Sequence, residues 1–338
     1  MALPLLSIVS RYLRVVSALA LAAFACNSDA PPPVTTSTVV LASGGSLTLH
    51  TLGTTGDTVL VLPGGPAFGS GYLQRALAPL AVRHTLIFVD FRGRGESPSV
   101  PAESLSMTLD LRDLEVVRRQ LQLDSFSIVG HHWGAGTAML YAVSHPHVVR
   151  RLALIGPMAD GITSIYELTR LPHDSLAIAR HASAIASGMA QLDPDRYCRN
   201  YWGFALSPAE EVDPTVIRRL GPSVCSAPIL RLQESPGVAR ALLGSLGAWE
   251  WRDTLGLVAA PTLVVAGDRD TQRAEAARLW ATRVSDGRLL LLSGSSAFPW
   301  VTDSRGFING IERFLDGAWP IAPPPASPTT TVSRADRD

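Results

Sequence analysis

The chain has 338 residues with 29 basic and 29 acidic side chains, and all of the basic ones are arginine. The formal net charge is therefore zero and no basic block exists, which excludes a protein that binds nucleic acid or a membrane surface through excess positive charge. Hydrophobic residues make up 46% of the sequence and charged residues 17%, as in an ordinary globular protein. The length allows one large domain or one domain with an inserted subdomain.

The N-terminus resembles an export signal. Arginines precede an apolar run over residues 15–25, which is too short to cross a bilayer comfortably and fits the core of a signal peptide. The run ends at Ala23-Phe24-Ala25-Cys26, which resembles a bacterial lipoprotein cleavage box, although leucine is usual where Ala23 stands. We expect Cys26 to be lipid-modified and to begin a mature chain anchored in the bacterial cell envelope.

The signal is expected to span residues 1–26, and the N-terminal lipid is the one membrane contact predicted. Two alternatives stay open, a plain secretory signal cut after Ala25 and an uncleaved anchor that includes residues 5–9. Residues 27–37, rich in proline, serine and threonine, predict a flexible tether. The proline-rich residues 319–338 predict a disordered tail.

Apart from Cys26, the chain contains two cysteines, Cys198 and Cys225. An even pair in an exported chain predicts a disulfide, because the compartment is oxidising. A bridge that closes a loop of this length stabilises a fold by roughly 3 kcal/mol when only chain entropy is considered. Two buried free thiols are the alternative.

From residue 38 onward, short apolar runs rich in β-branched residues alternate with longer amphipathic segments. Strands are predicted at residues 38–42, 46–52, 58–62, 85–90, 126–129, 151–155, 262–266 and 288–292, and helices at residues 108–121, 134–144, 273–284 and 306–315. Near-continuous apolar strands separated by helices predict an α/β fold with a mostly parallel, doubly wound sheet covered on both faces.

The alternation stops between Pro157 and Asp253, where helical segments replace it. This region predicts a helical cap inserted after the sixth sheet strand. The expected organisation is a core over residues 38–157, a cap over residues 158–253 and the rest of the core over residues 254–318.

Three loops that follow predicted strands contain residues of chemical interest, because ligands of such sheets bind at the carboxyl ends of the strands. These loops are Pro63-Gly64-Gly65-Pro66-Ala67, Phe91-Arg92-Gly93-Arg94-Gly95-Glu96-Ser97 and Gly130-His131-His132-Trp133-Gly134. The third has the frame of a nucleophile elbow, with glycines two residues before and two after a central residue on a tight strand–turn–helix bend.

These motifs resemble the α/β-hydrolase superfamily, and within it the proline iminopeptidases. The resemblance covers roughly residues 40–316 and rests on five motifs in the family's order: Gly64-Gly65-Pro66, the segment at residues 90–97, the elbow frame, the segment at residues 261–270, and Phe298-Pro299-Trp300. It implies an α/β-hydrolase fold and a site built from a nucleophile, an acid and a base, in that order along the chain.

The resemblance places the nucleophile position at His132, the acid at Asp270 and the base at Ala297, so two of the three positions hold replaced residues. Asp268 is the alternative acid. The base cannot lie elsewhere downstream, because the last of the eight histidines is His181. A serine hydroxyl needs an imidazole to accept its proton, and losing one member of such a triad costs about a million-fold in rate.

The oxyanion donors of the family are backbone N–H groups, which do not depend on side chains, and here they are those of Gly65 and Trp133. Two interpretations of His132 stay open. In one, the residue is a relic in a protein that no longer hydrolyses a substrate. In the other, its imidazole is a non-standard nucleophile or base that works with Asp270. Since Ala297 vacates the volume of the base, we expect the His132 ring to lean toward Asp270.

The cap is the expected place of a small-molecule or peptide ligand. Relatives that cleave N-terminal proline bind the substrate's ammonium group with cap carboxylates, and the candidates here are Glu210, Glu211, Glu234 and Glu250. Apolar candidates for the pocket are Trp202, Phe204, Trp249 and Trp251, which would equally serve to pack the cap on the sheet. No cofactor and no metal site is predicted.

Three functions are compatible with these residues. The first is an exported, lipid-anchored pseudo-hydrolase that binds a ligand or a partner without turnover. The second is an active aminopeptidase or esterase with a non-standard site at His132 and Asp270. The third is a structural protein of the cell envelope that retains the fold alone.

Overall fold

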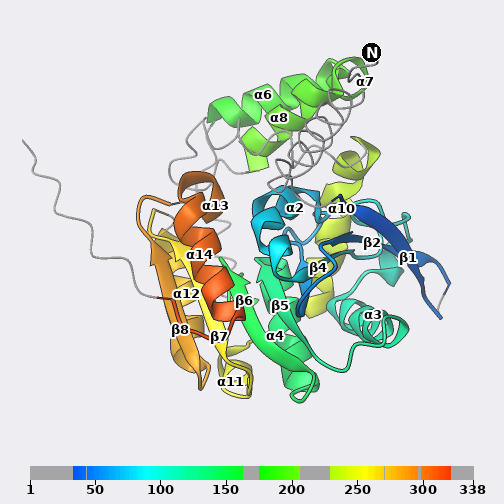
Figure 1. The fold of residues 1–338 in the computed structure, drawn as a ribbon. Helices are drawn as coiled ribbons and strands as arrows, with labels where there is room; N and C mark the ends of the chain where they lie inside the picture. The colour runs from blue at the N-terminus through cyan, green and yellow to red at the C-terminus, as the bar shows by residue number, and fades with distance from the viewer. Residues whose placement is uncertain are drawn as a thin grey trace, which may run out of the picture.

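A computed structural model of the protein describes residues 33–42, 44–162, 175–205, 229–269, 271–295 and 298–320. The sheet has eight strands in the order β1-β2-β4-β3-β5-β6-β7-β8 (Figure 1). The strands are β1 (Thr35–Val40), β2 (Ser46–Leu52), β3 (Thr58–Leu62), β4 (Thr85–Asp90), β5 (Phe126–His131), β6 (Val149–Ile155), β7 (Thr262–Gly267) and β8 (Gly287–Leu292). β1, β2 and β4 pair antiparallel, and every pair from β4 onward is parallel.

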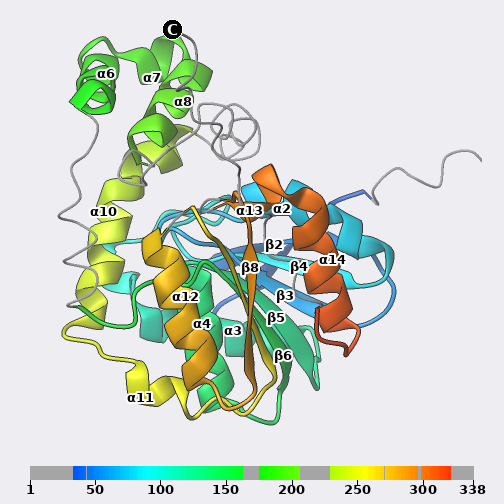
Figure 2. The same ribbon diagram turned by 90° about the vertical axis from the view of Figure 1, so that its left-hand side faces the viewer.

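Helices cover both faces of the sheet. The core helices are α2 (Gly71–Leu77), α3 (Met107–Gln120), α4 (Trp133–Ser144), α11 (Arg252–Leu255), α12 (Thr271–Arg283), α13 (Pro299–Thr302) and α14 (Ser304–Leu315), with 3-10 turns η1 (Ala78–Val82) and η2 (Ala102–Ser104). α3, α4 and α12 share one buried hydrophobic cluster, whereas α2 and α14 share the other (Figure 2). The predicted doubly wound α/β sheet is therefore confirmed.

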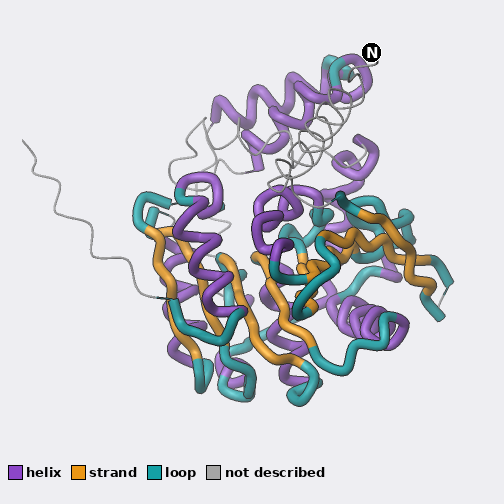
Figure 3. The backbone as a smooth tube through the Cα atoms, in the orientation of Figure 1, coloured by secondary structure: helices purple, strands orange, loops and turns teal. Residues whose placement is uncertain are grey.

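The predicted helical insertion after the sixth strand is also confirmed. It contains α6 (Ser175–Ala186), α7 (Met189–Leu192), α8 (Pro194–Ala205) and α10 (Ile229–Leu246). In Figures 1 and 3, α6, α7 and α8 lie above α2 and α13, the helices that follow β3 and β8. The cap thus lies on the side of the sheet where the parallel strands end, which is where ligands of such sheets bind.

The chain enters and leaves the cap through two segments that pair with each other. Ile162 donates its backbone N–H to the carbonyl of Trp249 (3.1 Å), and Trp251 donates its own to the carbonyl of Asp160 (2.7 Å). The Arg252 guanidinium then forms an ion pair with the Asp160 carboxylate at 2.8 Å. These contacts close the base of the cap.

Two predicted boundaries need correction. β1 begins at Thr35, inside the stretch at residues 27–37 that was expected to be a tether, because its threonines pair in register with β2. At the other end, Trp319 belongs to the fold and not to the tail, since its ring lies 5.1 Å from that of Phe314 and 4.3 Å from the Arg288 guanidinium carbon.

Several predictions fall outside the described residues. These are the signal at residues 1–26 with Cys26, most of the tail, and Cys225. Cys198 is buried in α8, but because Cys225 is not described the disulfide stays a prediction. Within the part of the chain that is described, no helix combines the length and the apolar character needed to cross a membrane.

A buried histidine joins the first hairpin to the rest of the sheet. His50 of β2 is 4% exposed, and its Nε2 lies 3.4 Å from the Asp90 carboxylate at the end of β4. Asp90 also accepts the backbone N–H groups of Ser70 (2.6 Å) and Glu96 (2.8 Å). The hydrogen bond from His50 to Asp90 raises the pKa of the imidazole above its ordinary value, against the opposing effect of burial.

This pair makes stability depend on pH in a defined direction. A histidine whose pKa is higher in the folded than in the unfolded protein stabilises the folded state. The full contribution is present below the pKa of the unfolded state, about 6.5, and it is lost as the pH rises through the pKa of the folded state. We expect the free energy of unfolding to fall more steeply in the native chain than in a His50→Gln variant as the pH rises above about 6.5. Urea unfolding at several pH values measures this, with the exposed His147→Gln as the control. Parallel curves for the native and His50→Gln chains would refute it.

Candidate functional site

The predicted elbow is a strained turn centred on His132. Residue 132 joins β5 to α4 with φ 49° and ψ −105°. Residues other than glycine rarely adopt this backbone conformation, which costs about 1–3 kcal/mol of conformational strain. Its N–H donates to the carbonyl of Ile155 in β6 (3.0 Å), and its own carbonyl accepts the N–H of Ala135 (3.1 Å). The half-buried His132 side chain therefore stands on a turn that neighbouring strands and the helix hold in place.

The two elbow glycines are required by the packing of the main chain. A Cβ at position 130 would lie 2.5 Å from the carbonyl oxygen of Gly134, which no real structure tolerates. A Cβ at position 134 would overlap the carbonyl of Leu62 at the end of β3 and would lie 2.7 Å from the carbonyl oxygen of Pro63. β5, α4 and the end of β3 thus approach one another backbone to backbone.

The loop after β3 lies against this turn. A Cβ on Gly64 would be 3.1 Å from the His132 Cβ, and Gly65, next in the chain, has a left-handed φ of 126° before a cis peptide bond to Pro66. Trp133 is the first residue of α4, so its N–H has no acceptor inside the helix. The structure therefore brings the two predicted oxyanion residues, Gly65 and Trp133, to the same end of the sheet beside His132.

A second histidine takes part in a buried hydrogen-bond chain beneath the turn. The Gly64 N–H donates to the hydroxyl oxygen of Tyr72 (2.8 Å), and that oxygen lies 2.5 Å from Nδ1 of His131. Burial raises the pKa of Tyr72 far above its usual value, so the hydroxyl keeps its proton. The proton needs an acceptor, and we therefore assign it to His131 Nδ1, which leaves the neutral imidazole with its own proton on Nε2. His131 in this tautomer is a donor and not a general base.

The predicted acid and base, Asp270 and Ala297, fall outside the described residues, and so does the expected contact between His132 and Asp270. The chain on either side of them is described. Arg269 donates its N–H to the carbonyl of Ser295 (2.9 Å), which joins the loop after β7 to the loop after β8. The Phe298 ring lies 5.6 Å from that of His131. Phe298, the residue after Ala297, thus lies beside the elbow, whereas the roles of Asp270 and Ala297 stay predictions.

The alternative acid, Asp268, has a structural contact. One of its carboxylate oxygens accepts the N–H of Gly294 at 2.7 Å, across the two loops. This bond fixes the turn after β8, which is the role of a turn carboxylate.

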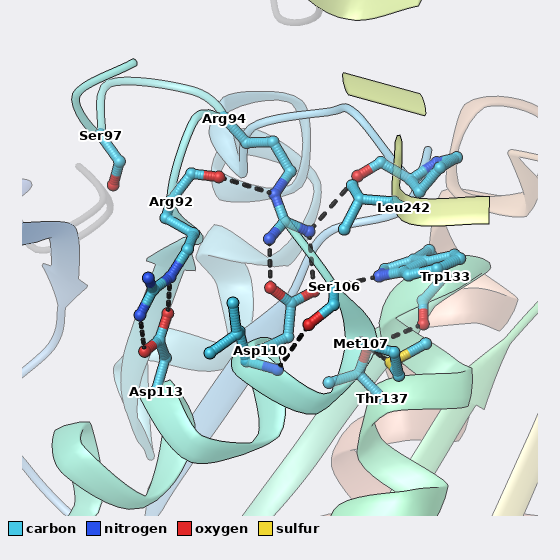
Figure 4. Close-up of polar contacts among 12 residues, drawn as sticks. Arg92, Arg94, Ser97, Ser106, Met107, Asp110, Asp113, Trp133, Thr137 and Leu242 are labelled. Carbon is cyan, nitrogen blue, oxygen red and sulfur yellow. Dashed lines mark hydrogen bonds and ion pairs between the residues drawn. The ribbon is translucent and has the colours of Figure 1, made fainter. Parts of the chain in front are cut away.

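Two buried ion pairs lie beneath the loop after β4 (Figure 4). Arg92 binds Asp113 of α3 in a bidentate pair, with Nε to Oδ2 at 2.7 Å. Arg94 binds Asp110, one turn earlier on α3, in the same way. Asp110 is fully buried, and its Oδ2 also accepts the indole N–H of Trp133 at 3.3 Å. This places a charged network directly under the elbow.

The described cap residues favour packing over ligand contact. Trp251 lies on α4, where a Cβ on Gly136 would be 2.9 Å from its ring. Trp249 packs beside Trp251, with the two ring centroids 6.2 Å apart. Glu250 accepts the N–H of Arg252 at 3.2 Å at the cap base. The other predicted cap residues have no described side chains; they are Trp202, Phe204, Glu210, Glu211 and Glu234. No group of three or more potential metal ligands occurs among the side chains that are described.

Sequence reasoning missed Tyr72 and the partners of the two arginines. Tyr72 follows a glycine-rich loop on a short helix with no amphipathic pattern, so nothing local marks it. Asp110 and Asp113 lie three residues apart and so share one face of α3. Two arginines two residues apart in a nearby loop, facing two aspartates on one helix face, are the signal that could have paired them.

Comparisons with known proteins agree with this geometry. The family described as alpha/beta hydrolase fold matches residues 57–272. The chain is 22% identical to a proline iminopeptidase of Thermoplasma volcanium over 76% of this chain and 88% of that protein. It is 24% identical to a proline iminopeptidase of Chitinophaga pinensis over 76% and 89% of the two chains. Among solved structures, the proline iminopeptidase of Mycobacterium smegmatis has a TM-score of 0.61 at 22% identity and covers 83% of this chain and 98% of its own.

The packing at the elbow makes a stability prediction. Gly134→Ala should lower the free energy of unfolding by about 3 kcal/mol or more, because the new methyl group meets backbone atoms that cannot move aside. The matched control is Gly244→Ala in α10, where a Cβ meets no atom within 4 Å. That change should leave stability equal or raise it by up to about 1 kcal/mol. Equal effects of the two substitutions in urea unfolding would show that the elbow is not tightly packed.

Proposed function

Since the chain belongs to the alpha/beta hydrolase fold family, we propose that it is a member that binds a small molecule or a peptide under its cap without serine-hydrolase turnover. The observation that supports this most is His132, which stands at the centre of an intact elbow where the family's mechanism needs a nucleophile. In this proposal the backbone donors that bind a carbonyl oxygen are retained, and the nucleophile that attacks the carbonyl carbon is replaced.

The second support concerns the base. No histidine follows His181 in the sequence, so the position downstream of β8 cannot supply an imidazole. The neighbouring His131 does not replace it, because Tyr72 holds it in the tautomer that donates from Nε2. Without a base, a hydroxyl or water nucleophile keeps its proton and remains a weak nucleophile.

The alternative function is an active aminopeptidase or esterase that uses His132 and Asp270. An imidazole can itself act as nucleophile or base. The side chain of His132, which is half-buried at the centre of the elbow, is the observation that supports this alternative. The proline iminopeptidase relatives suggest short peptides with an N-terminal proline as the first ligands to examine.

Rebuilding the missing groups tests the proposal. The native chain should neither hydrolyse p-nitrophenyl acetate and proline p-nitroanilide nor be labelled by a fluorophosphonate. The double variant His132→Ser with Ala297→His should gain measurable hydrolysis, because the elbow glycines and the backbone donors are still in place. We expect its rate to exceed that of either single variant by at least about a hundredfold, since such groups act as a unit.

Native hydrolysis that disappears in His132→Ala would instead establish the alternative enzyme. Comparable activity in the single and double variants would contradict the account of the replaced positions. Circular dichroism of each variant serves as the control for folding.

We also propose that the chain is exported, lipid-anchored through Cys26 and cross-linked between Cys198 and Cys225. The sequence of the N-terminal segment supports export, and the burial of Cys198 in α8 is compatible with a bridge in the cap. Mass spectrometry of protein from a bacterial membrane fraction should show a chain that begins at an acylated Cys26. Alkylation without reductant should leave Cys198 and Cys225 unmodified. An intact Met1, or two alkylated thiols, would overturn the respective part of this proposal.

A further inference from the structure

Both main-chain arms of the site are connected to a single guanidinium. One arm is the loop after β3, whose Pro66 carbonyl accepts a hydrogen bond from Nη1 of Arg94 at 3.4 Å. The other is the elbow, whose Trp133 indole donates to Asp110, and Asp110 in turn forms the bidentate ion pair with Arg94. In Figure 4 the Arg94 side chain lies between the Asp110 carboxylate and a backbone carbonyl, and the indole points at the same carboxylate.

The geometry points to Arg94 as the positioning residue of this site. Through one planar guanidinium it contacts the loop that contains Gly65 and, by way of Asp110, the helix start that contains Trp133. These are the two residues whose backbone N–H groups are the proposed donors to a ligand's carbonyl or carboxylate oxygen. This inference rests on the proposed function for its purpose, but the mechanical link stands on the contacts alone.

The chemistry of arginine suits this role. A guanidinium has donors that point in several directions within one plane, so it holds a carboxylate and a separate carbonyl at a fixed spacing. A lysine ammonium at the same place would pair with Asp110 as a point charge but would not hold both partners in a fixed geometry. Arg94 is 1% exposed and Asp110 0%, so water does not substitute for either bond.

The helix that contributes Asp110 is itself tied to the cap. The N–H of Met107, at the start of α3, donates to the Ser245 hydroxyl of α10 at 3.2 Å. The Arg94 network therefore meets the loop, the elbow and, through α3, the cap.

A purely structural role is the competing explanation, because changing one partner of any buried ion pair destabilises a fold by leaving the other charge poorly compensated. The chain supplies its own control for this. Arg92 and Asp113 form a second buried ion pair, with the arginine two residues earlier in the loop and the aspartate one turn later on α3. The hydrogen bonds of the Pro66 carbonyl and the Trp133 indole go to Arg94 and Asp110, not to this second pair.

Hydrogen exchange in the native-sequence chain and three single variants tests the inference. The reporters are peptides that contain Phe68, which donates to the Gly64 carbonyl, and Ala135 and Gly136, which donate to that of His132. Arg94→Lys should accelerate exchange in both peptides by about tenfold or more, as expected when a hydrogen bond of a charged group is lost. Trp133→Phe, which removes the indole N–H together with part of the ring volume, should accelerate exchange in the elbow peptide alone, and Arg92→Lys should accelerate exchange in neither peptide.

Equal acceleration in Arg94→Lys and Arg92→Lys, or an acceleration spread evenly along the chain, would overturn the positioning role. A second measurement uses catalysis in the His132→Ser, Ala297→His chain, or in the native chain should that prove active. There, Arg94→Lys should lower kcat for p-nitrophenyl acetate by about tenfold with little change in KM, and Arg92→Lys should not. Hydrolysis by the native chain would overturn the proposed function and leave this inference intact. The exchange measurement does not depend on turnover, so it tests the positioning role separately from the proposed function.

Discussion

The approach of three main-chain segments around residue 132 is the constraint on which the site depends. The end of β3, the end of β5 and the start of α4 pack so closely that positions 130 and 134 have no room for a Cβ. The turn between them has a left-handed φ at residue 132. The side chain of His132 is half-buried there, and its Nδ1 is buried. The elbow thus accommodates a histidine at its centre, while its two glycines are fixed by backbone packing.

The same constraint explains why a family resemblance is strong here while the reactive groups differ. The elbow glycines are required by the close approach of backbone segments, and the oxyanion donors are main-chain groups that do not depend on side chains. Residue 132 and the acid and base positions after β7 and β8 are required by the chemistry of turnover and not by this backbone approach. Binding of a carbonyl group needs only the elbow glycines and the backbone donors, whereas turnover also needs a nucleophile, an acid and a base. The proposed function follows from this division between what the elbow requires and what catalysis requires.

The sequence predicted the sheet, the cap and the elbow because each depends on local pattern. The strand ranges agree within a few residues, since buried parallel strands are continuous apolar runs. The sequence did not reveal the chain from Gly64 through Tyr72 to His131, or the tie between His50 and Asp90. These contacts join residues far apart in the chain, and a lone histidine or tyrosine bears no mark of its partner. The start of β1 was missed because threonines pair in a sheet as readily as they form a tether.

Two adjacent histidines at the elbow have opposite circumstances, and the difference decides what the site can do. His131 points to the buried side, where Tyr72, Phe298 and Trp300 surround its ring and a hydrogen bond sets its tautomer. The ring of His132 lies 6.3 Å from that of His131, and its side chain is half-buried. A proton relay between them would require His131 to give up its Nε2 proton while Tyr72 still donates to Nδ1, which would create a buried imidazolate. The cost of burying such a charge excludes that route, so His131 orders the floor of the site and any chemistry or binding belongs to His132 and the backbone donors beside it.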